Sequence, residues 1–126
     1  MVKLVYPKES YQVMGFLFDI QNELGTIYQE KHYQRALSIK LKKNNIPFKK
    51  EMPVNLFQDG ELFGKFVADF VIYGKILIEL KVKPRLSIDD NKQVLRYLRA
   101  MKIKLGILVN FYQNPLEYQR IINKIN

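Results

Sequence analysis

Three charged side chains lie in segments of the chain that are otherwise apolar. Glu79 and Lys81 interrupt an apolar run over residues 76–82, and Asp69 interrupts a similar run over residues 67–71. Because residues two apart in a β-strand point to the same face, Glu79 and Lys81 should share one face of their strand. A turn between the two runs would fold the strands together. The carboxylates of Asp69 and Glu79 are therefore expected to converge.

Two carboxylates at a poorly solvated site repel each other, so that one stays protonated unless a cation lies between them. Magnesium prefers oxygen ligands and keeps several waters, and it commonly takes only one or two protein carboxylates. Asp69 and Glu79 match this demand, and manganese could substitute for magnesium. A bound metal polarises a phosphate and lowers the pKa of a bound water, while Lys81 would position that water or stabilise negative charge. The pattern predicts phosphodiester hydrolysis.

A simpler interpretation remains open for Glu79 and Lys81. A Glu and a Lys at alternate positions of a strand can form an ion pair on an exposed face without any catalytic role. The apolar character of the strand and the second acid, Asp69, in an equally apolar neighbour argue against this interpretation. We therefore take all three residues as candidate catalytic residues.

The elements that must position these residues follow from apolar spacing and turn residues. Helical spacing and end signals predict helices over 10–24, 29–43 and 87–102, with a last short helix from Pro115 to about Asn123. Strand patterns cover about 48–57, 62–73, 76–82 and 105–111, with turns at Asp59-Gly60 and Gly74-Lys75. This order predicts an α/β fold with a mixed four-stranded sheet flanked by helices. The sheet would consist of a three-stranded antiparallel meander plus one strand that follows a crossover helix.

Composition limits the kinds of site and partner. The chain of 126 residues has a formal net charge of +9, no cysteine and one histidine, His32. Thiolate and histidine-rich metal sites are thereby excluded, and any metal must bind to oxygen. The positive charge favours an anionic partner such as nucleic acid. Without an apolar run long enough for a signal peptide or a membrane span, residues 1–126 are expected to form a single soluble, cytoplasmic domain with no membrane partner.

The same residues carry a family resemblance. Asp69, nine intervening residues and Glu79-Leu80-Lys81 resemble the signature of the PD-(D/E)XK nuclease superfamily, and the element order is similar to its restriction-endonuclease-like core. The chain also resembles the narrower GxxExxY family of small bacterial proteins over about residues 13–111. The residues that carry the narrower resemblance are Leu24-Gly25, Glu30, Tyr33, Ala36-Leu37, Ala68-Asp69, Glu79-Leu80-Lys81, Gln93, Tyr97 and the segment 105–111. Two positions depart from these patterns, since Ile27 replaces the family's glycine and Ala68 replaces the superfamily's proline.

The resemblance implies roles for individual residues. Asp69, Glu79 and the backbone carbonyl of Leu80 would be metal ligands, and Lys81 would be the catalytic lysine. Glu30 would be a further ligand or a water-positioning group reaching over from its helix, although an acid near a helix N-terminus also simply favours the helix dipole. Two supporting residues, Gln93 and Tyr97, would help to shape the site.

Two classes of function fit these observations. The first is a magnesium-dependent nuclease acting on nucleic acid, with DNA as the expected substrate and RNA as the alternative. The second is a nucleic-acid-binding or accessory interaction domain that has the same fold and does not cleave. Lys92, Arg96 and Arg99 on the crossover helix could follow a phosphate backbone, but they would also fit a solvated helix face. A homodimer is compatible with either function, and no sequence feature requires one.

Overall fold

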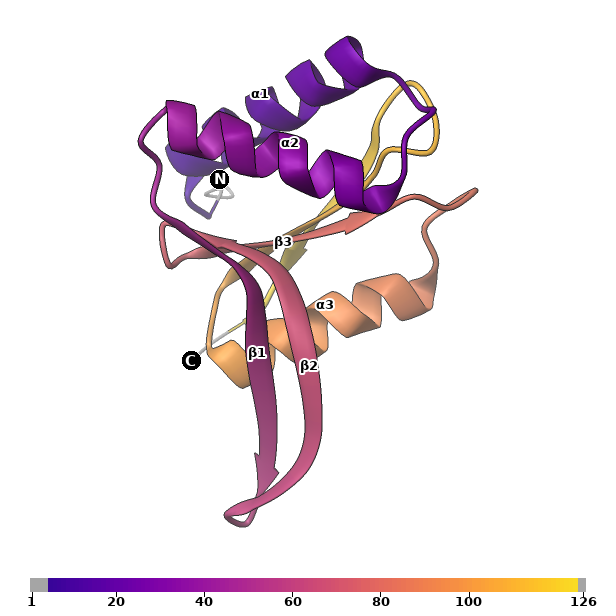
Figure 1. Cartoon of the computed structure of the whole chain (residues 1–126). Coiled ribbons are helices and arrows are strands. Elements are labelled where there is room, and N and C mark those ends of the chain that lie inside the picture. The colour runs from indigo at the N-terminus through magenta and orange to yellow at the C-terminus, as the bar shows by residue number, and fades with distance from the viewer. Residues whose placement is uncertain (1–4, 125–126) are drawn as a thin grey trace, which may run out of the picture.

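A computed structural model describes residues 5–124 of the chain, which form helices and strands in the order shown in Figure 1. The helices are α1 (Pro7–Leu24), α2 (Glu30–Lys43) and α3 (Ile88–Met101). The strands are β1 (Phe48–Gln58), β2 (Glu61–Ile72), β3 (Ile76–Lys81), β4 (Leu105–Asn110) and β5 (Glu117–Ile122). No helix within this part of the chain is long and apolar enough to cross a membrane.

The five strands form one mixed sheet in the order β1-β2-β3-β4-β5. Strands β1, β2 and β3 form the predicted antiparallel meander, and β4 pairs in parallel with β3 after the crossover helix α3. These predictions are confirmed. The helix predicted from Pro115 to Asn123 is wrong, because that segment forms β5 and makes the sheet five-stranded rather than four-stranded. Antiparallel pairing with β5 satisfies backbone groups on the outer edge of β4, which would otherwise be buried without partners.

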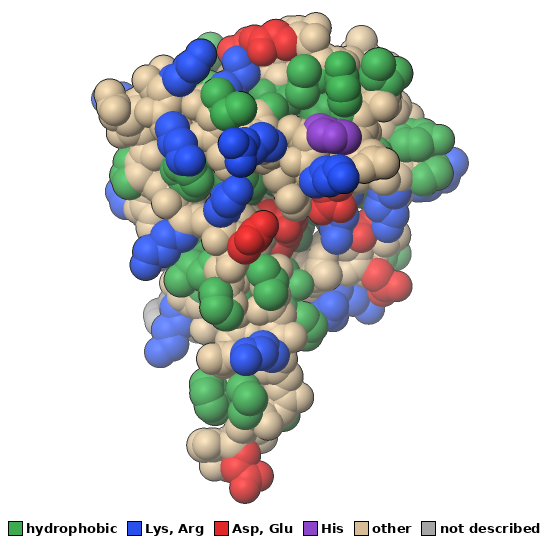
Figure 2. Space-filling model, in the orientation of Figure 1, with side chains coloured by type: hydrophobic (Ala, Val, Ile, Leu, Met, Phe, Trp, Pro, Cys, Tyr) green, Lys and Arg blue, Asp and Glu red, His purple; other side chains and the backbone are tan. Residues whose placement is uncertain are grey.

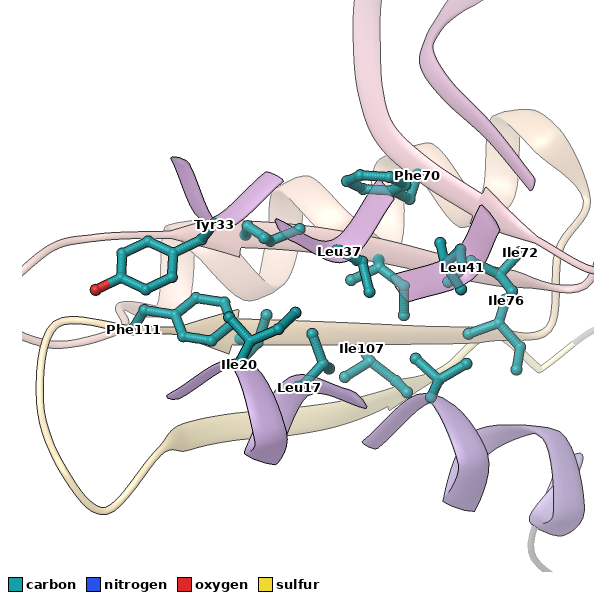
Figure 3. Packing of buried hydrophobic residues seen from close by; sticks show 14 of the residues in the cluster. Leu17, Ile20, Tyr33, Leu37, Leu41, Phe70, Ile72, Ile76, Ile107 and Phe111 are labelled. Carbon is teal, nitrogen blue, oxygen red and sulfur yellow. The ribbon is translucent and has the colours of Figure 1, made fainter. Parts of the chain in front are cut away.

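Helices α1 and α2 cover one face of the sheet. Their buried apolar residues pack against alternate residues of β3 and β4, as the close view in Figure 3 shows. At one end of this layer the ring of Tyr33 stacks on that of Phe111, with centroids 4.4 Å apart and planes 5° from parallel. The α2 helix is thereby fixed against the segment that follows β4.

Helix α3 covers the opposite face of the sheet, where its Val94, Tyr97 and Leu98 are buried. The close approach of α3 to the sheet requires glycine at one position of β4. A Cβ atom added to Gly106 would lie 2.6 Å from Val94 Cγ1, which is inside van der Waals contact. A capping box starts α3, since the Asp90 N–H donates to Ser87 Oγ and the Ser87 N–H donates to Asp90 Oδ2.

The β1–β2 hairpin extends well beyond the rest of the sheet (Figure 1). Strand β2 pairs with β3 only through residues 70–72, although it pairs with β1 along nearly its whole length. Residue Glu51 of β1 lies opposite Asp69, has a left-handed backbone with φ 52° and is not paired in the β1–β2 ladder. Strand β2 therefore separates from β3 next to Asp69.

Candidate active site

Asp69 and Glu79 lie together where β2 separates from β3. The N–H of Leu80 donates to Asp69 Oδ2 over 2.8 Å, and the N–H of Asp69 approaches Glu79 Oε1 at 3.4 Å. The carboxyl of Asp69 thus takes the place of a β2 backbone carbonyl as the partner of β3. The structure brings together the two acids that the sequence singled out.

Strand alternation determines which groups face this opening. Leu77 packs in the apolar cluster under α3, whereas Ile78 and Leu80 pack in the cluster under α1 and α2. Glu79 and Lys81 therefore share the α3 side of the sheet. In a strand, the N–H and C=O of one residue point to the same edge. Because the Leu80 N–H binds Asp69, the Leu80 carbonyl also faces the gap between β2 and β3.

The surroundings of Glu79 disfavour its charged form. Its side chain is only 3% exposed, although it is an acid. Burial, together with the hydrogen bonding and charge of Asp69, raises the pKa of Glu79 to about 10, while Lys81 opposes this shift. In the absence of a cation the site therefore holds a proton at neutral pH.

Lys81 lies beside the acids and is held by α3. Its Nζ donates to Gln93 Oε1 over 2.9 Å. One helical turn further along α3, burial followed by the charges of Glu79 and Asp69 raises the pKa of the Tyr97 hydroxyl. Gln93 and Tyr97 therefore both lie near Lys81 and the two acids. The helix contributes one side chain that orients the lysine and one that borders the acids.

Glu30, the first residue of α2, approaches the same group from the opposite layer. Burial and then the charge of Asp69 raise the pKa of Glu30, whereas Lys81 lowers it. Glu30 is thus within electrostatic reach of both residues. The Tyr33 hydroxyl holds the preceding loop, since it donates to the Gly25 carbonyl over 2.6 Å and accepts from the Tyr28 N–H over 3.3 Å. Sequence reasoning gave no role to this hydroxyl, although a tyrosine on the buried side of a helix commonly needs a hydrogen-bond partner.

A second polar network holds the loop between β3 and α3, and sequence reasoning missed it. Fully buried Asn110 binds the Lys83 backbone through both ends of its side-chain amide, and it also donates to Glu117 Oε1. Glu117 in turn accepts from the Leu86 N–H. Lys83 forms an ion pair with Asp90 at 2.8 Å, which holds the pKa of Asp90 low despite its burial. A polar residue at the end of the apolar strand β4 was the available signal.

The residues present fit a divalent metal that carries much of its own water. No three acidic or histidine side chains within residues 5–124 lie close enough together to form a complete metal-binding group. Magnesium does not require such a group, because one or two carboxylates and several waters suffice. The two backbone contacts occupy Asp69 Oδ2 and Glu79 Oε1, which leaves the second oxygen of each carboxylate for a cation. A cation in this position would also replace the proton that Glu79 otherwise keeps.

The surface around the site is strongly charged. Figure 2 shows acidic side chains gathered at the junction between the helical layer and the projecting hairpin, with many Lys and Arg side chains around them. A negatively charged polymer would be attracted to the basic surroundings, and the acids would be available for a metal.

Comparison with known proteins assigns a family to this arrangement. The family model described as the PD-(D/E)XK nuclease superfamily matches residues 7–121. That range contains every candidate site residue. No curated protein is similar enough in sequence to match the chain.

Two solved structures share the fold. SSO0001 is 22% identical with a TM-score of 0.60, and the match covers 96% of this chain and 61% of that one. An alkaline exonuclease, LHK-Exo from Laribacter hongkongensis, is 13% identical with a TM-score of 0.53, and the match covers 96% of this chain and 73% of that one. At these identities the matches establish the α/β fold alone. The chain spans only 61% of the length of SSO0001.

Proposed function

The chain belongs to the PD-(D/E)XK nuclease superfamily, and we propose that it is a magnesium-dependent nuclease that hydrolyses phosphodiester bonds of nucleic acid, with DNA as the proposed substrate. The observation that carries this proposal is the placement of Asp69 beside buried Glu79 at the gap between β2 and β3. The fold shared with an alkaline exonuclease adds support.

Asp69, Glu79 and the Leu80 carbonyl would hold the metal. Once bound, it would polarise the scissile phosphate and lower the pKa of a bound water. Glu79 would lose its proton to solvent, because its carboxylate would then face a cation rather than the acid of Asp69 alone. Manganese would serve in place of magnesium, since both are small ions that accept oxygen ligands.

Lys81 would act directly at the phosphate. Its ammonium, held by Gln93 Oε1, is a compact positive charge beside the acids. In this position it would orient the attacking water or stabilise the negative charge that develops on the phosphate oxygens. Tyr97 would border the same space from α3.

Glu30 would complete the site from α2 by holding the attacking water or a water of the metal, since no three acids of residues 5–124 lie close enough together to ligate one ion directly. Its electrostatic coupling to Asp69 and Lys81 supports this role. Within the superfamily we place the chain with the GxxExxY group. In support, the charges of Asp69 and Lys81 act on Glu30, and Tyr33 holds the loop before it.

Cleavage assays with purified protein test the proposal. Labelled single-stranded and duplex DNA and RNA should be cleaved with magnesium or manganese, and an excess of chelator should stop the reaction. Glu79→Ala and Lys81→Ala should abolish cleavage, whereas Lys43→Ala, an exposed lysine at the end of α2, should not. Activity that survives Glu79→Ala or Lys81→Ala would refute the assignment. Binding with a steep salt dependence and no cleavage of any substrate would favour the accessory binding domain instead.

A further inference from the structure

A second surface lies where the projecting half of the hairpin meets α3. A groove of about 460 Å³ is lined there by Phe57 and Phe63 of the hairpin and by Arg96 and Arg99 of α3, together with Asn55, Leu56 and Ala100. None of these lining residues is acidic. The groove is thus built from aromatic rings and guanidinium groups.

The aromatic side of the groove is unusually open. Phe57 and Phe63 are 61% and 65% exposed, and Leu62 and Val67 of the same hairpin are more than half exposed. Figure 2 shows that hydrophobic side chains on the projecting hairpin are left uncovered by the rest of the molecule. Exposed apolar residues gathered on one element commonly mark a binding surface.

The basic side of the groove belongs to a regular stripe on α3. Lys92, Arg96 and Arg99 follow the helical spacing i, i+4, i+7, so they lie on one side of the helix, and all three are exposed. Among residues 5–124, none of the three forms an ion pair with a carboxylate. Their charges are therefore free to meet an anionic partner.

This groove is connected to the candidate active site through α3 and β2. Arg96 is three residues beyond Gln93, which holds Lys81, and its guanidinium lies 6.0 Å from the centre of the Phe66 ring. The Phe66 ring in turn packs against Tyr97 at 5.2 Å. From Arg96 to Gln93 is three residues of α3, or roughly 5 Å, and from Phe63 to Asp69 is six residues of β2, or roughly 20 Å, so a strand of several nucleotides would reach from the rings to the site.

The combination of open rings and unpaired guanidinium groups fits one class of ligand best. Aromatic side chains stack on nucleobases, and positive groups beside them hold the phosphates between the bases. In a duplex each base is already stacked on its neighbours, so that its faces are not available. The rings therefore favour an unpaired strand over a duplex.

We propose that the groove between the hairpin and α3 binds a single-stranded segment of the nucleic-acid substrate, with Phe57 and Phe63 stacking on unpaired bases and Arg96 and Arg99 holding phosphates. This inference rests on the proposed nuclease function, since it assigns the form of nucleic acid that reaches the site. The groove would act as the binding surface that leads a strand end, a flap or an overhang to Asp69 and Glu79.

Binding of fluorescently labelled oligothymidylate and of a blunt duplex, measured in chelator, tests the proposal without cleavage. Phe57→Ala/Phe63→Ala should weaken single-strand binding about tenfold or more and change duplex binding far less. Tyr11→Ala removes an aromatic ring that is 83% exposed on α1, outside the groove, and should bind like wild type. Arg96→Gln/Arg99→Gln should weaken single-strand binding and flatten its salt dependence. Lys42→Gln/Lys43→Gln removes the same charge from the end of α2 and should weaken single-strand binding much less.

Wild-type binding of the single strand by the phenylalanine variant would overturn the proposal, and so would an equal loss for both ligands. Tighter binding of polyglutamate than of oligothymidylate would overturn it in favour of an acidic protein partner. Because these substitutions are exposed, thermal unfolding should confirm that the variants fold. Cleavage with magnesium separates the two claims. If the protein cleaves DNA and the groove variants change neither binding nor cleavage, only the groove proposal is refuted. If the groove variants weaken binding but the wild-type protein cleaves nothing, only the nuclease function is refuted.

Discussion

The carboxyl of Glu79 lies where its charge is most costly, buried against α3 beside Asp69. In an unfolded chain its pKa would be near the ordinary value of 4.5, whereas in the folded protein it rises to about 10. Between these values the folded protein keeps a proton that the unfolded chain releases. The free energy of unfolding contributed by this group therefore falls as the pH rises through that window.

Glu79→Gln should remove this dependence, because glutamine keeps the shape of a neutral carboxyl and does not titrate. In chelator, the variant should be more stable than wild type at about pH 8, and the difference should shrink towards about pH 5. Urea unfolding across this pH range measures the effect. If the free energy of unfolding varied with pH in the same way in both proteins, Glu79 would ionise in the folded protein as it does in the unfolded chain, and the prediction would be wrong.

At the scale of the elements, the site depends on how α2 and α3 pack against the sheet. The α2 end that carries Glu30 is held through the Tyr33 hydroxyl, and the α3 side chains reach Lys81 because Gly106 allows close packing. Neither Tyr33 nor Gly106 needs to touch a substrate. Changes at these residues should therefore alter the site by moving whole elements.

Tyr33→Phe keeps the ring that stacks on Phe111 but removes both hydrogen bonds to the loop before Glu30. We expect a loss of about 1 kcal/mol in the free energy of unfolding and a lower kcat, because Glu30 is less firmly placed. Denaturant unfolding and steady-state cleavage measure the two effects. Tyr28→Phe is the matched control, since its hydroxyl forms no hydrogen bond with residues 5–124. An equal effect of both variants would contradict the role of Tyr33.

Gly106→Ala should push α3 away from β4, because the new methyl group meets Val94 at 2.6 Å. Overpacking of this kind costs about 1–3 kcal/mol in stability, and the shifted Gln93 should lower kcat as well. Gly15→Ala in α1 is the control. Its added Cβ meets nothing within 4 Å and should stabilise the protein by about 0.5–1 kcal/mol. If Gly106→Ala had wild-type stability and activity, the close packing of α3 on β4 would not be needed to position Gln93.

Local patterns in the sequence predicted most of these elements, and the exceptions have physical causes. Helices α1, α2 and α3, the turn at Asp59-Gly60 and the parallel pairing of β4 follow from apolar spacing, caps and turn residues. Strand β5 was predicted as a helix because Pro115 is typical of a helix start. Its extended form depends on pairing with β4, which is a long-range interaction without a local signal.

The same distinction applies to the site. Period-two alternation is sufficient to place Glu79 and Lys81 on one face. The position of Asp69 beside Glu79 depends on the separation of β2 from β3, and the unpaired Glu51 opposite Asp69 has no signature in the sequence. The Asn110 and Glu117 network could not be predicted once β5 was taken for a helix.

At the scale of the whole molecule, the charge distribution determines how substrate arrives. The chain has a net charge of +9, basic side chains lie around an acidic centre on the face shown in Figure 2, and α3, which carries the basic stripe, contacts Lys81 through Gln93. Such a field raises the rate of encounter with a polyanion and weakens as salt screens it. The chemical step, which takes place at partly buried groups, should be screened much less.

Salt should therefore raise the KM for nucleic acid while leaving kcat nearly constant. Each phosphate neutralised by the protein contributes a slope of roughly 0.7 to 0.9 in log affinity against log salt. Steady-state cleavage between about 50 and about 200 mM salt measures both constants. A KM that does not change over this range would indicate that the basic surface takes no part in binding.

Single-turnover cleavage of labelled DNA by Asp69→Asn, with Asp89→Asn as control, tests the central claim most directly. Asp89 is an exposed acid of α3, so its variant loses the same charge outside the site. With magnesium and saturating enzyme, we expect Asp89→Asn to cleave at the wild-type rate and Asp69→Asn to be slower by about a hundredfold or more, since a metal ligand is lost. Cleavage by Asp69→Asn at the wild-type rate would contradict the proposed role of the two acids.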